Sequence, residues 1–95
     1  MVQTLPALPA RLIHADADGF LAKCVAQLDG ASLSAGAGVS IDSSALTDFD
    51  SSVLALLLGV RRAVVSRGGV LEVNGMPSRL RDLATLYGVS ELLPE

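Results

Sequence analysis

The sequence predicts an α/β fold with a small mixed or parallel β-sheet and helices packed on it. Two short apolar segments, 39–42 and 70–73, have the length and composition of buried strands. Each is followed by a segment whose apolar residues recur at helical spacing. Strands that alternate with helices in this way are typical of parallel sheets. A chain of 95 residues suffices for one core, so residues 1–95 are expected to form a single domain.

The N-terminal half of the chain is expected to contain an extended segment, a helix and a loop. Residues 1–14 are extended in character, but two prolines restrict them to an N-terminal arm or an edge strand. Apolar spacing predicts a helix over 16–28, with Asp16 or Asp18 as its N-cap. The small residues of 30–38 predict the loop that leads into the first internal strand.

The C-terminal half is expected to contain two helices, one on each side of the second internal strand. The first, over 53–67, ends at a Gly-Gly pair, which suits a left-handed C-terminal turn. Pro77 opens the second, at a position where its missing N–H costs nothing, and a short segment follows at 89–93. The buried face of this last helix is predicted to consist of Leu80, Leu83, Ala84 and Tyr87.

The helix predicted over 53–67 has a broad apolar face and an opposite stripe of small residues. At 100° per residue, the apolar face that should lie on the sheet consists of Val53, Leu54, Leu56, Leu57, Val60, Val64 and Val65. The opposite stripe consists of residues that are all small except Arg62, namely Ser51, Ser52, Ala55, Gly59, Arg62, Ala63 and Ser66. A solvent-facing helix normally carries long polar side chains there. The stripe therefore indicates either a docking surface for a partner or the place where the first or third helix packs.

The segment 47–54 places an acid and two hydroxyls where a strand-like segment becomes this helix. Asp and Ser are favoured at an N-cap because their side-chain oxygens accept hydrogen bonds from free backbone N–H groups. Asp50 or Ser51 is therefore a candidate cap. The same N–H groups and the helix dipole would stabilise added negative charge, such as a phosphate on Ser51.

Composition and motifs argue against several classes of function. The chain has seven basic and ten acidic residues, and the basic residues form no cluster. Nucleic-acid binding depends on basic residues that neutralise phosphates, so it is not expected. The one histidine, His14, has no cysteine or acidic cluster at ligand spacing, so no metal site is expected. The chain has neither a P-loop nor a nucleophile elbow. We therefore expect no cofactor, no catalytic residue and no small-molecule substrate.

The sequence also favours a cytoplasmic location without direct membrane insertion. The longest apolar run, 53–60, is far too short to span a bilayer, and the N-terminus lacks the pattern of a signal peptide. The single cysteine, Cys24, cannot form an intrachain disulfide and suits a reducing compartment.

The order of these elements and motifs resembles that of STAS domains. The resemblance covers residues 38–94 and rests on Ile41-Asp42, Leu46, Asp50-Ser51-Ser52, Leu54, Leu57-Leu58, Gly69, Val73, Leu83 and Leu86-Tyr87-Gly88-Val89. Within this family the chain resembles most the STAS subunit of the Mla-type phospholipid ABC transporter (MlaB-like). Its second resemblance within the family is to the anti-sigma-factor antagonists. The resemblance implies the STAS fold and a module that binds another protein.

Carried over to this chain, the resemblance implies a non-enzymatic accessory subunit. Its partner would be the cytoplasmic ATPase of a phospholipid-transporting ABC system that maintains outer-membrane lipid asymmetry. The ATPase and its permease would hold the protein at the inner membrane. Ser51 matches the family's regulatory Ser or Thr, and Asp50 matches its preceding acid. Partner-binding residues are then expected to be Asp50, Ser51, Ser52, Ala55 and Gly59, with Arg62 available to pair with an acid on the partner.

Two other functions stay open at this point. One is a regulatory switch of the anti-sigma-factor antagonist type, in which a kinase phosphorylates Ser51. Val53, at a position where antagonists usually have glycine, and the short N-terminal region favour the transporter branch. The other is a domain that binds a small anion or nucleotide at the start of the helix over 53–67. In the transporter reading, replacing Gly59 with leucine should abolish binding and leave the fold intact.

Overall fold

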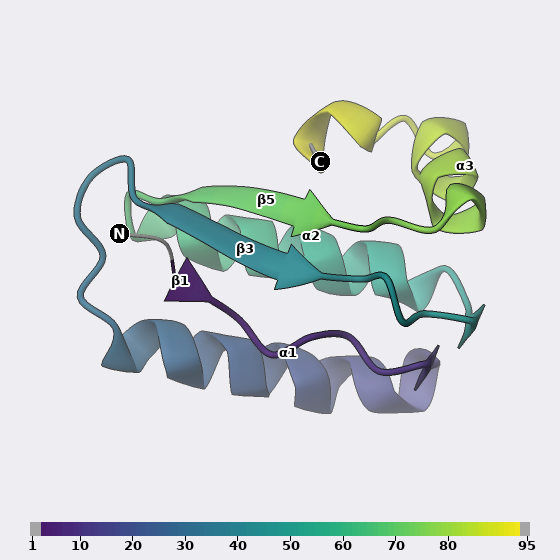
Figure 1. Ribbon diagram of the computed structural model, residues 1–95, viewed down its shortest axis with the longest axis horizontal. Helices are drawn as coiled ribbons and strands as arrows, with labels where there is room; N and C mark the ends of the chain where they lie inside the picture. Colours follow the sequence, from purple (N-terminus) through teal and green to yellow (C-terminus); the bar gives the residue numbers. More distant parts are fainter. Residues whose placement is uncertain (1–2, 94–95) are drawn as a thin grey trace.

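Three parallel strands form the main sheet of the protein (Figure 1). The computed structural model describes residues 3–93. Strands β1 (Gln3–Thr4), β3 (Gly38–Asp42) and β5 (Val70–Asn74) pair in the order β1-β3-β5. The two internal strands were predicted from the sequence, and they are confirmed with their boundaries extended by one residue each. Strand β1 lies at an edge of the sheet, where a proline-containing segment is tolerated.

A second pairing joins two strands of two residues each. Strands β2 (Arg11–Leu12) and β4 (Asp48–Phe49) run parallel, and an ion pair of 3.3 Å links Arg11 Nε to Asp48 Oδ2. The backbone N–H groups of residues 47 and 48 also donate to the carbonyl oxygen of Ala10. Since a helix starts just after each strand, this pairing brings two helix N-termini together.

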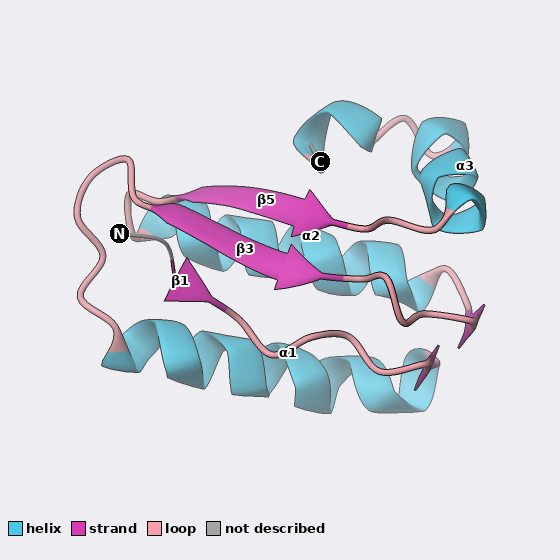
Figure 2. Cartoon of the chain, in the orientation of Figure 1, coloured by secondary structure: helices cyan, strands magenta, loops and turns pink. Residues whose placement is uncertain are grey.

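Helices α1 (His14–Gly30) and α2 (Ser52–Ser66) lie side by side on one face of the sheet (Figure 2). Helix α1 begins two residues earlier than the sequence predicts. Asp16 lies inside its first turn, where its carboxylate accepts a hydrogen bond of 3.2 Å from the Ile13 backbone N–H. The N-cap residue is Ile13, and the Asp16 side chain satisfies its backbone N–H from within the first turn. Neither Asp16 nor Asp18 is therefore the N-cap residue.

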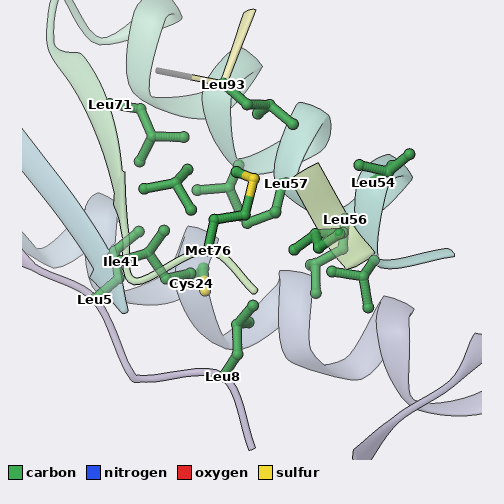
Figure 3. Packing of buried hydrophobic residues seen from close by; sticks show 14 of the residues in the cluster. Leu5, Leu8, Cys24, Ile41, Leu54, Leu56, Leu57, Leu71, Met76 and Leu93 are labelled. Carbon is green, nitrogen blue, oxygen red and sulfur yellow. The ribbon is translucent and has the colours of Figure 1, made fainter. Parts of the chain in front are cut away.

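The hydrophobic core lies between the sheet and these two helices. Alternate strand residues are almost completely buried on the covered face, namely Val39, Ile41, Leu71 and Val73. Side chains from distant parts of the chain pack with them, including Leu5, Leu8, Leu57 and Met76 (Figure 3). On the opposite face Ser40 is half-buried and Glu72 is exposed, so that face remains open to solvent.

Helix α3 (Ser78–Leu86), beyond the end of β5, and a short 3-10 turn, η1 (Ser90–Leu92), complete the fold (Figure 1). Leu80 and Ala84 are buried as predicted and Leu83 is half-buried, but the prediction for Tyr87 is wrong. Its side chain is 58 % exposed because the helix ends at Leu86 and Gly88, at φ 71°, turns the chain away.

One residue of the apolar face predicted for α2 is not covered by the sheet. Val65 was assigned to the apolar face of α2, yet it is 49 % exposed, because it lies at the edge of the helix face that packs on the sheet.

After β5, Gly75 turns the chain at φ 65°, and a Cβ atom there would lie 2.7 Å from Ser44 Cβ. Among the helices of residues 3–93, none combines the length and apolarity needed to cross a membrane.

Candidate functional site

Asp50 organises the start of helix α2. One carboxylate oxygen, Oδ1, accepts hydrogen bonds from the Ser52 backbone N–H at 3.0 Å and from the Ser52 hydroxyl. The other, Oδ2, accepts a hydrogen bond of 3.1 Å from the His14 backbone N–H at the start of α1. The hydrogen bond from the Ser52 hydroxyl lowers the pKa of Asp50, with smaller contributions from the Ser52 and His14 N–H groups. Asp50 therefore stays ionised and holds two helix N-termini.

Ser51 is left free by this arrangement. It occupies the N-cap position of α2 with helical backbone angles, φ −65° and ψ −12°, and its side chain makes no capping hydrogen bond. Across residues 3–93 its hydroxyl has no hydrogen-bond partner, and the residue is exposed. Of the two candidate caps left open by the sequence, Asp50 thus does the capping. Ser51 presents its hydroxyl to solvent beside the positive end of the α2 dipole.

The small-residue stripe of α2 divides between a packed edge and an exposed centre. At the packed edge, a Cβ atom added to Gly59 would lie 3.0 Å from Leu21 Cδ2 of α1. The glycine therefore lets α1 approach α2 closely, which is one of the alternatives that the stripe left open. Ala55 and Arg62 remain exposed at the centre, and Ser52 is half-buried.

Most of the candidate partner-binding residues lie at the start of α2. Asp50, Ser51, Ser52 and Ala55 lie within its first turn and the turn before it. Arg62 lies seven residues beyond Ala55, which corresponds to about 10 Å along a helix. We give the name α2 surface to the half-buried Ser52 together with four exposed residues, Asp50, Ser51, Ala55 and Arg62.

A small groove borders the α2 surface on the side of α1. It has a volume of about 140 Å³ and is lined by His14, Ala17, Asp18, Leu21, Ser52, Ala55 and Leu56. The four α1 residues recur at helical spacing, so their common face could have been read from the sequence. Their position against α2 could not, because β2–β4 pairing and the Asp50–His14 bond create it.

The hydrogen bonds of Asp50 do not join Ser51 and His14 into a catalytic triad. Asp50 holds the backbone of His14 and not its imidazole, and the Ser51 hydroxyl is not bonded to either residue, so no charge relay is assembled. Cys24 is completely buried in the core, and burial raises the pKa of its thiol to about 11. A neutral, inaccessible thiol is a poor nucleophile. Residues 3–93 contain no group of three or more His, Cys, Asp or Glu side chains placed to hold a metal ion.

Comparison with known proteins identifies one family. The model of the family described as Mlab, STAS domain matches residues 7–94, which is nearly the whole chain. The match includes every residue of the α2 surface. No curated protein sequence matches the chain.

Proposed function

Because the chain belongs to the MlaB-type STAS domain family, we propose that it is a non-enzymatic accessory subunit of a phospholipid-transporting ABC system. It binds the cytoplasmic ATPase of that system through the α2 surface. The ATPase and its permease keep it at the cytoplasmic side of the inner membrane. Family membership by itself gives a STAS-domain protein with an accessory or regulatory role.

The observation that carries the proposal is the combination of a fixed backbone and a free side chain at the start of α2. Asp50 fixes the position of Ser51 through hydrogen bonds to Ser52 and His14, while the Ser51 hydroxyl stays exposed. A surface that is already ordered loses little conformational entropy on binding. Small side chains such as Ala55 allow the partner's backbone to approach closely.

Binding of this kind changes the partner's activity only through a difference in affinity between conformations. If the α2 surface fits the assembled ATPase better than the separated subunits, the population shifts toward the assembled state. The accessory subunit then supports transport without taking part in any chemical step.

The test is a pull-down of the tagged chain from its native host in gentle detergent, with mass spectrometry of the co-purified proteins. The expected result is an ABC ATPase together with its membrane permease, lost when Ala55 is replaced by arginine. A matched control is Ala26→Arg, which makes the same replacement at an exposed position of α1 away from the α2 surface. Recovery of a small ATP-binding kinase or a sigma factor in place of the transporter would overturn the proposal.

One observation favours a second function, the phosphorylation switch of the anti-sigma-factor antagonists. The Ser51 hydroxyl is exposed, unbonded and next to a helix N-terminus, where a phosphate would be stabilised. Val53, however, is completely buried, so the segment that a kinase would have to grasp is anchored in the core. The intact mass of protein isolated from the native host tests this function, since phosphorylation adds one phosphate at Ser51.

A further inference from the structure

A second groove lies on the other side of α2, beside the η1 turn. It has a volume of about 370 Å³ and is lined by Leu58, Arg61, Arg62, Val65, Ser66 and Leu92. Its apolar part is accessible to a partner, because Val65 and Leu92 are 49 % and 39 % exposed. We call these six residues the α2–η1 groove. It shares only Arg62 with the α2 surface.

The charge of the groove sets it apart from the rest of the protein. The chain carries a formal net charge of −3, yet the residues that line the groove include two arginines and no acid. Arg61 and Arg62 make no ion pair or hydrogen bond with their side chains to any other residue of the described part of the chain. The other five basic residues all have intramolecular contacts: Arg11 with Asp48, Lys23 with Phe20, Arg67 with Asp29, Arg79 with Phe49 and Arg81 with Met76.

We propose that the α2–η1 groove binds a short acidic amphipathic segment of a partner protein. An apolar side chain of the segment covers Val65 and Leu92, and a neighbouring carboxylate pairs with Arg61 and Arg62. Guanidinium groups match carboxylates in both charge and geometry. An amphipathic segment that lays its apolar side into a groove is a common mode of peptide recognition.

Charge complementarity decides the class of occupant. An acidic segment is repelled by most of this net-acidic surface and attracted where the two unpaired arginines lie, which favours one register on the groove. A nucleic acid would require many more cationic contacts than two. The inference does not depend on the ATPase being the partner, because the α2–η1 groove shares only Arg62 with the α2 surface and does not involve Ser51.

A fluorescence anisotropy titration of the full chain tests this inference. The probe is a labelled helical peptide with leucines at i, i+3, i+4 and i+7 and glutamates at the remaining surface positions. A second peptide has lysines in place of the glutamates. Saturable, salt-sensitive binding of the glutamate peptide only is expected, weakened at least tenfold by the double replacement Arg61→Glu and Arg62→Glu.

Two variants separate the groove from general effects of charge. Lys23→Glu reverses one charge on α1, away from the groove, which is half the charge change of the double replacement, and it is expected to bind the glutamate peptide within about twofold of the unmodified protein. Val65→Ser removes exposed apolar surface without touching the core and is expected to weaken binding severalfold. Circular dichroism melts of all variants show that the fold is retained.

Several results would overturn the inference. Absence of saturable binding, equal binding of the lysine peptide, or full binding by the Arg61 and Arg62 variant would each exclude an acidic segment as the occupant. Vesicles of phosphatidylglycerol and phosphatidylcholine provide the last comparison. If the unmodified protein bound them and the arginine variant did not, the groove would belong to a lipid surface and not to a partner protein.

Discussion

The Asp50 carboxylate accepts a hydrogen bond of 3.1 Å from the His14 backbone N–H, across 36 positions of sequence. A single side chain thereby joins the starts of α1 and α2, because its other oxygen receives the Ser52 N–H. Asp50 thus holds the two helices together and is also part of the α2 surface. Its substitution is expected to affect both.

Replacing Asp50 with alanine should lower the stability of the fold. The change leaves the N–H groups of His14 and Ser52 without their acceptor, whereas Asp50→Asn keeps an acceptor oxygen. The urea concentration at half unfolding is expected to fall in the order unmodified protein, Asp50→Asn, Asp50→Ala. Equal midpoints for the three proteins would show that these hydrogen bonds do not stabilise the helix starts.

The same residue gives the stability a defined pH dependence. The pKa of Asp50 is lower in the folded protein than in the unfolded chain, mainly because of the hydrogen bond from the Ser52 hydroxyl. Its contribution is therefore present above the unfolded Asp pKa of roughly 3.9 and is lost as the pH falls through the folded pKa. Chemical unfolding of the unmodified protein and of Asp50→Asn from pH 7 to pH 3 measures this. The difference between the two proteins in the free energy of unfolding should decrease as the pH falls. A difference that stayed constant would contradict the lowered pKa of Asp50 in the folded protein.

Gly59→Leu should destabilise the protein, contrary to the expectation from the sequence that the fold would remain intact. Even the Cβ atom would lie 3.0 Å from Leu21 Cδ2, so the Leu21 side chain must shift, and the rest of a leucine side chain would crowd this contact between α1 and α2 further. Overpacking of this kind typically costs about 1–3 kcal/mol in the free energy of unfolding. The matched control is Ala55→Leu, on the exposed centre of the same helix, which should change stability by less than about 0.5 kcal/mol. Urea unfolding of both variants measures the difference, and equal effects would contradict the Gly59–Leu21 contact.

Ser51→Glu should change stability and binding in opposite directions. A carboxylate at the start of α2 interacts favourably with the helix dipole and should raise the free energy of unfolding by about 0.3–1 kcal/mol. The added charge and bulk should weaken the proposed partner complex at least tenfold. Ser51→Ala serves as a control, because the hydroxyl it removes makes no intramolecular hydrogen bond. A Ser51→Glu variant that bound its partner fully would exclude Ser51 from the interface.

Cys24 should react only when the protein opens. Its thiol is completely buried and its pKa is raised to about 11 by that burial, so the reactive thiolate is scarce at neutral pH. Labelling with a thiol-specific reagent at pH 7.5 should be at least about a hundredfold slower in buffer than in concentrated urea. Comparable rates would show that α1 detaches readily from the core.

The elements that depend on residues close together in the sequence could be predicted from it. Strands β3 and β5 and helix α2 are recognisable because apolar residues recur with a period set by each element, and the Asp50-Ser51-Ser52 start of α2 is recognisable from capping chemistry. The two-residue strands β2 and β4 have no such period. Tyr87 fits the apolar spacing of α3, and only the early end of that helix exposes it.

The relation between elements could not be predicted in the same way. The Asp50–His14 bond uses a backbone N–H group, which every residue but proline possesses, so His14 carries no distinguishing signal. The contact of Gly59 with Leu21 joins residues 38 positions apart. A stripe of small residues shows that something approaches closely, and the structure identifies α1 as the neighbour on the Gly59 edge.

The turn at Gly75 has a consequence for experiments that substitute every position and score loss of partner binding. Its backbone angle, φ 65°, and the 2.7 Å approach to Ser44 exclude every other side chain without rearrangement of the turn. Such a scan is expected to register Gly75 as strongly as a residue of the interface, although it lies beyond the end of β5 and not on α2. Abundance of the folded protein, scored in parallel, would separate the two kinds of sensitivity and leave the binding map to the exposed residues of α2.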